Sequence, residues 1–312
     1  MENQMEVSSA PVEERKRRSF LADLFTRLIK EKPLGVIGGV ILLVLLIVAI
    51  LADVLAPFGM NQMNLDVRLS APTSENWLGA DHLGRDLLSR VIYGARISVI
   101  VGLAGTAISA FVSTVLGLIS GFAGGKTDLV IQRIVDALMS FPTFVIALSL
   151  ISLTGPGLVQ VIFILGVISG YRWVRVIRSA VITIKENVYV EAARAIGVPN
   201  RRMLLRHILP NIMPVIIVVA TINIGRIIID EAALSFLGFG IPPPAPSWGG
   251  MLSGDARTYM IQAPWLALWP GVALALVVYG ANMLGDAMRD LLDPRLRGGL
   301  GRYSGVKRKL PK

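Results

Sequence analysis

One run of residues has the types that bind nucleotide phosphates. Gly124, Gly125, Lys126 and Thr127 match the end of a phosphate-binding loop, in which backbone amides and the lysine hold the phosphates of ATP. The first glycine of that pattern is replaced by Ser120, and an apolar run precedes it where the loop requires a strand. The rest of the sequence shows no other nucleotide-binding motif. We therefore expect no ATP site in this chain, so that any ATP that drives it is hydrolysed by another chain.

The side chains that could catalyse a reaction or hold a metal ion are also few. The sequence has no cysteine, which excludes disulfides and thiolate ligands, and its only histidines are His82 and His207. The topology argued below places these histidines on opposite sides of a membrane, where they cannot share a metal ion or a catalytic triad. No polar stretch is much longer than about 45 residues, below the usual size of a domain, and no reactive dyad is visible for catalysis within a membrane. We predict no catalytic residue, no metal site and no bound cofactor in this chain.

Residues 191–210, EAARAIGVPNRRMLLRHILP, form a polar, arginine-rich segment between apolar runs. Residues 191–195 are good helix formers, Gly197 tolerates the positive φ of a break, and Pro199 can open a second helix. That second helix is amphipathic, because apolar and basic residues gather on different faces: Met203, Leu204 and Ile208 against Arg202 and Arg206. Pro210 marks a change of direction into apolar sequence. The alternative is an ordinary basic loop whose arginines only fix topology.

The elements around this segment are those of a membrane protein. Apolar residues make up 54% of the chain and charged residues 17%, against a usual charged share of about 25%, and mean hydropathy is +0.65. Uncharged runs occur at residues 34–52, 97–125, 137–171, 208–225 and 258–285. A helix needs about 20 residues to cross the hydrocarbon core, so the third run, divided at Gly155-Pro156-Gly157, supplies two spans. We predict six transmembrane helices.

The first apolar run follows a basic segment, as in a cleavable signal peptide. Its core is too long and no small-residue cleavage site follows Ala52, so we predict an uncleaved first span. Just before it, apolar residues recur at helical spacing opposite Arg27 and Lys30: Phe20, Leu21, Leu24, Phe25, Leu28 and Ile29. This pattern indicates a helix on the membrane surface, and the alternative is a simple continuation of the first span.

Lysine and arginine are unevenly distributed among the polar segments. Residues 1–32 carry seven, 172–206 eight and 289–312 eight, whereas 53–96 carry four, 154–157 none and 231–262 one. Because positively charged segments are retained in the cytoplasm, both termini are predicted to be cytoplasmic. The same asymmetry accounts for the net charge of +10, which therefore does not indicate nucleic-acid binding. The predicted parts are a cytoplasmic N-terminal segment (1–32), a first span (33–56), an extracytoplasmic segment (57–94), a core of five spans (95–288) that includes the loop 172–210, and a cytoplasmic tail (289–312).

Some residues are spaced to pair along or between helices. Four pairs of opposite charge are expected: Asp81 with Arg85, Asp86 with Arg90, Arg133 with Asp136, and Arg226 with Asp230. The first two predict a short helix that satisfies its own charges before the second span. Glycines four apart predict places where helices pack closely: Gly35 with Gly39, Gly117 with Gly121, and Gly166 with Gly170.

The pattern of residues 191–210 resembles the EAA loop of bacterial ABC importer permeases. In that family the loop contains the coupling helix, which docks into a cleft of a separate ATPase subunit. By this resemblance, the ATPase-coupling residues would be Glu191, Ala192, Ala193, Arg194, Gly197, Arg201, Arg202, Ile208 and Pro210. Glu191, Ala193 and Gly197 would shape the turn and the contact surface that transmit ATP-driven closure.

Residues 77–99, WLGADHLGRDLLSRVIYGARISV, resemble the segment before the second span in the dipeptide, oligopeptide and nickel branch of these permeases. The family usually has threonine at the position of Ala80, which is a mild departure. Further matches extend the resemblance over roughly residues 77–297: Arg133-Ile134-Val135-Asp136, Pro246-Ser247-Trp248-Gly249, Ala263-Pro264-Trp265, Leu284-Gly285-Asp286 and Asp293-Pro294-Arg295. The triplet Glu231-Ala232-Ala233 lacks the downstream Ile-Leu-Pro spacing, and we interpret it as a structural part of the outer segment.

The resemblance implies an all-α integral membrane protein with six transmembrane helices, the type I permease fold of ABC importers and a cytoplasmic coupling helix. The chain resembles the second of the two homologous permeases of such importers. By the same resemblance, the chain lies in a bacterial or archaeal cytoplasmic membrane, surrounded by lipid. Its expected partners are a homologous second permease, two ABC ATPase subunits that bind ATP and Mg²⁺, and an extracytoplasmic substrate-binding protein. The expected function is import of di- or oligopeptides by alternating access. The alternatives are a permease of this architecture for nickel chelates, glutathione or another small solute, and a self-contained secondary transporter, for which no internal repeat is evident. No residue is assigned to the substrate path.

Overall fold

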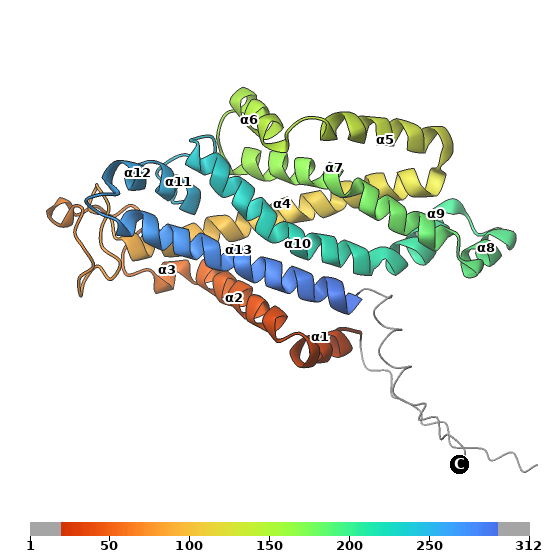
Figure 1. Ribbon diagram of the computed structural model, residues 1–312, viewed down its shortest axis with the longest axis horizontal. Coiled ribbons are helices and arrows are strands. Elements are labelled where there is room, and N and C mark those ends of the chain that lie inside the picture. Colours follow the sequence, from red (N-terminus) through yellow and green to blue (C-terminus); the bar gives the residue numbers. More distant parts are fainter. Residues whose placement is uncertain (1–19, 293–312) are drawn as a thin grey trace, which may run out of the picture.

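The computed structural model describes residues 20–292, and every regular element within them is helical (Figure 1). The predicted all-α class is confirmed, and the predicted features at residues 1–19 and 293–312 lie outside the described residues. In chain order the elements are α1 (Phe20–Glu31), α2 (Pro33–Ile50), α3 (Ala52–Leu55), η1 (Leu65–Val67), α4 (Leu87–Ala123), α5 (Gly125–Met139), α6 (Thr143–Thr154), α7 (Leu158–Lys185), α8 (Val188–Ala195), α9 (Asn200–Arg202), η2 (Met203–Ile208), α10 (Leu209–Phe236), α11 (Trp248–Ser253), α12 (Asp255–Tyr259) and α13 (Trp265–Leu292).

Five of the described helical stretches are long and apolar enough to cross a membrane: α2, α4, α7, the stretch 200–236 formed by α9, η2 and α10, and α13. Helices α5 and α6 pass this test only together, and they are bent by 86° at the break between them. The six predicted spans are thus present if this bent pair counts as the third. Pro142, which has no backbone N–H, stands at the break and precedes α6. This bend was not predicted from the sequence.

Helices α4 and α7 pack extensively against each other at the centre of the molecule (Figure 1). A Cβ atom placed on Gly117 of α4 would lie 2.7 Å from Cβ of Ile177 in α7. In the other direction, a Cβ atom on Gly166 of α7 would lie 2.7 Å from Cβ of Ile108 in α4. Larger residues would push the two helices apart, because interiors are already close-packed. These two predicted glycine pairs therefore do mark sites of close helix packing.

Charged groups contribute strongly to the contact between α5 and α7, since Val135 is the one fully buried residue of α5. Arg178 donates two hydrogen bonds to Asp128, from Nε at 2.6 Å and from Nη2 at 2.5 Å. Ser120 of α4 donates a third hydrogen bond to the same carboxylate. Three residues earlier on α7, Arg175 is paired with Asp136. Ion pairs consequently contribute much of the attachment of α5 to α7, whereas α6 packs on the apolar core through Ala147 and Ile151.

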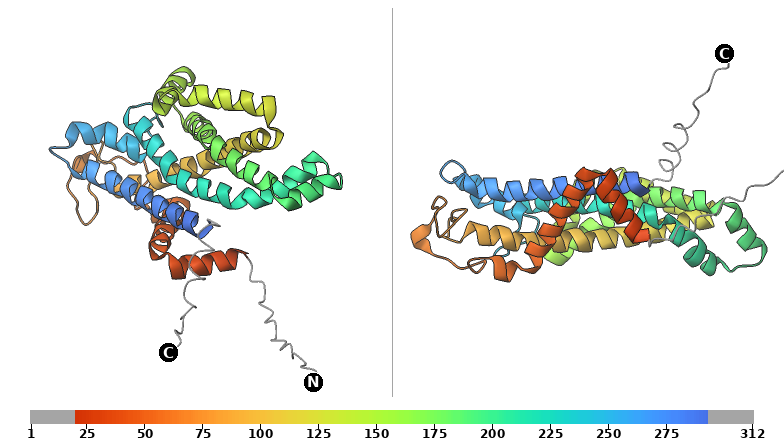
Figure 2. Two further views of the ribbon diagram at one scale, coloured as in Figure 1. Left: turned by 45° about the vertical axis from the view of Figure 1, so that its right-hand side comes forward. Right: turned by 90° about the horizontal axis from the view of Figure 1, so that it is seen from below.

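The polar segments lie at the two ends of the long axis (Figures 1 and 2). Residues 57–86 with α11 and α12 form one end, and α8 with α9 forms the other. Helix α1 meets α2 at Lys32 and Pro33, where the chain turns (Figure 2), so α1 is not a continuation of the first span. Phe25 and Ile29 of α1 are exposed. An apolar face left open in this way fits the predicted helix on the membrane surface.

Candidate coupling surface and outer cavity

The end of the molecule formed by α8 and α9 rests on a rigid apolar base. Buried side chains from α7, α8, η2 and α10 meet in one cluster, which we call the base cluster: Ile177, Val181, Val190, Ala193, Met203, Ile208 and Ile212. Beside it, Lys185 at the end of α7 donates a 2.7 Å hydrogen bond to the carbonyl of Phe122 in α4. The base cluster therefore joins α8 directly to two of the membrane-spanning helices.

Helix α8 ends in a turn that only glycine suits. Gly197 has φ +79°, its N–H donates to the carbonyl of Arg194 at 3.0 Å, and Val198 N–H donates to the carbonyl of Ala193 at 3.1 Å. These two hydrogen bonds define a Schellman motif, in which the residue after the cap takes a left-handed conformation. Ala193 and Val198 both contact the base cluster. The predicted break at Gly197 is confirmed.

The segment after α9 is a π-helix, η2, in which Leu209 N–H donates to the carbonyl five residues back, that of Leu204. Residues five apart in such a turn lie on one face. Met203 and Ile208 are both buried for this reason, whereas in an α-helix they would point about 140° apart. The predicted apolar face is therefore correct, but the predicted helix type is wrong. The π turn is what brings both side chains into the base cluster.

The outward surface of this hairpin is both apolar and basic. Val188 and Ile196 are 80% and 82% exposed, and Tyr189 and Leu205 are exposed as well. Exposed charged residues from the predicted coupling set surround them: Glu191, Arg194, Arg201 and Arg202. We call these apolar and charged side chains together the distal face. Large apolar side chains that remain this exposed at a polar end of the molecule indicate a docking surface.

The predicted coupling residues thus divide into two groups. Ala193 and Ile208 are buried in the base cluster, and the others are exposed: Glu191, Ala192, Arg194, Gly197, Arg201, Arg202 and Pro210. Sequence reasoning missed the exposed apolar residues of the distal face. An α-helical pattern gave no signal for Leu205, because residues three apart lie on one side of an α-helix and Leu205 is three residues before the buried Ile208.

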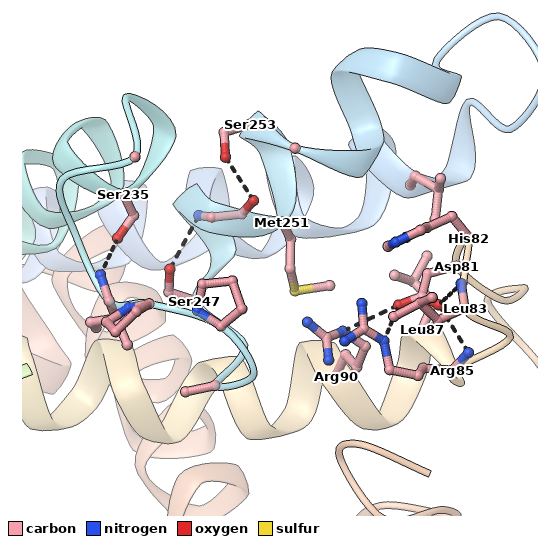
Figure 3. A pocket seen from close by; sticks show the side chains of 18 residues that line it. Asp81, His82, Leu83, Arg85, Leu87, Arg90, Ser235, Ser247, Met251 and Ser253 are labelled. Atoms are coloured by element: carbon pink, nitrogen blue, oxygen red, sulfur yellow. Dashed lines mark hydrogen bonds and ion pairs between the residues drawn. The ribbon is translucent and has the colours of Figure 1, made fainter. Parts of the chain in front are cut away.

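A cavity of about 450 Å³ lies at the opposite end of the molecule, between residues 81–90 and residues 235–254 (Figure 3). Asp81 forms the centre of its charged wall. The Asp81 carboxylate accepts hydrogen bonds from the backbone N–H groups of Leu83 and Arg85, both at 2.9 Å, and from Nε of Arg85 at 2.6 Å. Arg90 Nε lies 3.6 Å from the same carboxylate. Buried carboxylates need such partners, because an unpaired charge away from water is costly.

The short helix predicted here is wrong, because residues 80–86 form a turn and α4 begins only at Leu87. Asp81 pairs with Arg85 as predicted, but within this turn. Asp86 is the N-cap of α4 and accepts 2.7 Å hydrogen bonds from the N–H and the hydroxyl of Ser89. Asn76 donates a further hydrogen bond to Asp86 at 2.9 Å. A carboxylate at this position satisfies a backbone N–H that the helix itself leaves without an acceptor.

The other wall of the cavity is anchored by a buried glutamate in α10. Ser235 donates a 2.7 Å hydrogen bond to Glu231, and its hydroxyl accepts the N–H of Ile241 at 3.3 Å. Ser247 caps α11 by accepting the N–H of Gly250 at 3.1 Å. The triplet at residues 231–233 lies near the end of α10, at the end of the molecule opposite α8 (Figure 1).

The two histidines lie far apart. His82 and His207 are at opposite ends of the molecule, and within residues 20–292 no group of three or more possible ligands could hold a metal ion.

Two further predictions concerned ion pairs. Arg133 lies 3.7 Å from Asp136 as predicted. The predicted ion pair between Arg226 and Asp230 is wrong, because no salt bridge joins them within the described residues; Asp230 interacts electrostatically with both Arg226 and Arg172. Gly124 and Gly125 form the turn between α4 and α5, with no strand before it.

Comparison with known proteins places this geometry in a family. The model of the binding-protein-dependent transport system inner membrane component matches residues 113–298, and that of the N-terminal TM domain of oligopeptide transport permease C matches residues 19–72. The dipeptide transport system permease protein DppC of Alkalihalophilus pseudofirmus is 39% identical over 86% of this chain and 88% of its own length. The glutathione transport system permease protein GsiD of Pectobacterium atrosepticum is 37% identical over 88% and 91%. The di/tripeptide transport system permease protein DppC of Pseudomonas aeruginosa is 37% identical over 84% and 89%. The chain therefore belongs to the inner membrane permeases of ABC importers, in the dipeptide and oligopeptide branch.

Proposed function

We propose that this chain is the permease subunit of an ATP-driven importer that moves di- or oligopeptides into the cell by alternating access. Two of the relatives described above are named for dipeptide or di/tripeptide transport, which supports a peptide substrate. A third is named for glutathione transport, so glutathione is the first alternative solute. Nickel chelates and other small solutes follow. The test measures uptake of a radiolabelled dipeptide in the presence of each unlabelled solute. The solute that inhibits uptake most strongly is the preferred substrate.

The proposed orientation puts both termini and the distal face in the cytoplasm and the outer cavity outside. The counts of lysine and arginine in the polar segments support it, since the segments at the α8 end are the basic ones. Two ABC ATPase subunits, which bind ATP and Mg²⁺, would dock at the cytoplasmic end. A substrate-binding protein would meet the outer end, and a homologous permease would complete the membrane pathway.

The proposed coupling follows from how α8 is mounted. The distal face, with Ile196 and Val188 as its apolar contacts and Arg194, Arg201 and Arg202 as its charged ones, docks into an ATPase cleft. Displacement of α8 acts on the base cluster, whose members come from α7 and α10 as well. Close-packed apolar side chains transmit displacement because they are nearly incompressible. Movement of the ATPases would then rock α7 and α10 together and expose the pathway to the other side.

The observation that carries this proposal is the exposed apolar surface of the distal face on a rigid base, and affinity capture tests it. The chain is purified from its native membrane in mild detergent, and mass spectrometry identifies the proteins that accompany it. Three forms are compared: the native chain, Gly197→Leu, and Gly155→Leu as a matched control. Both glycines have positive φ, +79° and +84°, and a Cβ atom placed on either would meet no other atom within 4 Å. With its ψ of 157°, Gly155 has a backbone conformation that leucine adopts even less readily, so the control turn is strained at least as much as the turn at Gly197.

We expect an ATPase and a second permease with the native chain and with Gly155→Leu. Gly197→Leu should retain the second permease and lose the ATPase. Recovery of the native chain alone, with transport intact after reconstitution, would overturn the proposal in favour of a secondary transporter. Equal recovery of the ATPase with all three forms would contradict the assignment of the distal face.

A further inference from the structure

An apolar groove of about 280 Å³ opens between α2 and α4, away from the distal face and the outer cavity. Its walls are aliphatic side chains and two glycines: Gly39, Leu42, Leu43, Leu45 and Leu46 of α2, Val99, Gly102 and Leu103 of α4, and Ile224 and Ile228 of α10. All three helices belong to membrane-spanning stretches. The groove therefore lies among apolar side chains at a depth where the surrounding solvent is lipid.

The end of the groove toward the outer side carries three polar side chains. Arg96 stands three residues before Val99 on α4, so it lies about 5 Å beyond the groove along the helix axis. It donates a 2.7 Å hydrogen bond from Nη2 to Asp53 and a 3.0 Å hydrogen bond from Nε to the carbonyl of Ala49 at the end of α2. The Arg96 guanidinium carbon lies 5.7 Å from the centre of the Tyr93 ring. Tyrosine and arginine at the end of a span are typical of the membrane–water interface.

Both charges of this ion pair remain accessible. The side chain of Asp53 is 68% exposed and that of Arg96 is 34% exposed. A guanidinium has five N–H donors, and Arg96 makes four hydrogen bonds, to Ala49, Ile50 and twice to Asp53. One donor is left for a phosphate oxygen, and the exposed Asp53 carboxylate can accept a hydrogen bond from an ammonium group. The charges at the mouth of the groove are thus complementary to a headgroup that carries both signs.

The lining of the groove suits a hydrocarbon chain. The groove has a volume of about 280 Å³ and is walled by aliphatic side chains from three helices. A chain of methylene groups that lies in it contacts apolar atoms along its length and brings no polar group that would need a hydrogen-bond partner there.

We propose that this groove binds one acyl chain of a zwitterionic phospholipid whose phosphate contacts Arg96 and whose ammonium contacts Asp53. The lipid would be a fixed ligand of the permease between α2 and the body of the molecule. Phosphatidylethanolamine has the required headgroup, and an anionic lipid such as phosphatidylglycerol would bring its charge against Asp53 without an ammonium to compensate.

Native mass spectrometry tests this lipid site. The permease is purified with its partner subunits, delipidated, and titrated with dioleoyl phosphatidylethanolamine or dioleoyl phosphatidylglycerol. We expect one tightly bound phosphatidylethanolamine, preferred over phosphatidylglycerol by about fivefold, as for one exposed charge pair. Val99→Trp, which fills the groove, should remove this lipid. Ile100→Trp is the matched control, because its side chain is exposed beside the groove and does not line it.

A separate variant tests the headgroup. Asp53→Asn should keep one bound lipid and abolish the preference between the two headgroups, because only the contact with the ammonium is weakened. Equal lipid binding by the native protein and Val99→Trp would overturn the site, and so would absence of bound lipid in the native complex, since a partner subunit would then cover the groove. A native preference for phosphatidylglycerol would overturn the headgroup assignment.

Discussion

The proposed docking of the distal face rests most on Ile196, which is the C-cap of α8 and is 82% exposed. Ile196→Asp would place an unpaired charge in an interface that excludes water, at an expected cost of about 1 to 3 kcal/mol. We expect recovery of the ATPase to fall about tenfold or more, with no change in the thermal midpoint of the purified chain. Ile261→Asp is the control, since Ile261 is 96% exposed at the other end of the molecule. Equal ATPase recovery with both variants would count against docking through Ile196.

Asp86 contributes stability at the start of α4, where it accepts three hydrogen bonds from Ser89 and Asn76. Asp86→Ala removes the N-cap and leaves buried donors without an acceptor, so we expect a loss of about 1 to 2 kcal/mol. The measurement is the thermal midpoint in detergent. Asp66→Ala, at an exposed position of the same outer segment, should leave the midpoint unchanged. A midpoint for Asp86→Ala that matches the control would refute this role of the cap.

At the scale of elements, the attachment of α5 to α7 depends on Arg178. Arg178→Met keeps most of the side-chain length and leaves the partly buried Asp128 without its two strongest donors. We expect a loss of about 1 to 2 kcal/mol in the free energy of unfolding. Proteolysis should begin earlier at the 140–142 break between α5 and α6, because α5 is held less firmly against α7. Arg133→Met should have almost no effect on either measurement, because the Arg133 side chain is 76% exposed and such pairs contribute little.

The sequence predicted an element correctly where a single physical rule determined its position or its end. Apolar runs near 20 residues identified the spans, and Gly197 identified the end of α8. The bend at Pro142 was missed because the uncharged run continues through it, and hydropathy does not report a change of direction. Asp81 pairs with Arg85 as predicted, but the short helix predicted at these residues was wrong, because Asp86 caps α4 and that helix begins only at Leu87.

For the whole molecule, the uneven distribution of lysine and arginine leads to a test of orientation. The sequence has no cysteine, so Ile196→Cys and Ile261→Cys each carry one reactive thiol. We expect a membrane-impermeant maleimide to label Ile261→Cys in intact cells and, in cells that express the permeases without their ATPase subunits, Ile196→Cys only after permeabilisation. Labelling of both in intact cells, or the reverse order, would refute the proposed orientation. The two ends were predictable from charge counts, whereas the outer cavity was not, since it is built from segments about 150 residues apart.

The π-helix has a consequence for insertions and deletions. The π turn holds one residue more than an α turn, so removing one residue from 204–207 would let the stretch 200–236 close into an ordinary α-helix. Met203 and Ile208 would then be four residues apart, about 40° from each other on one face, and the distal face would keep its direction. A second deletion has no such reserve, because it would turn α8 and α9 by about 100° around the axis of α10, with every side chain of the distal face intact but aimed elsewhere. Chain length at this point therefore tolerates the loss of one residue and not of two.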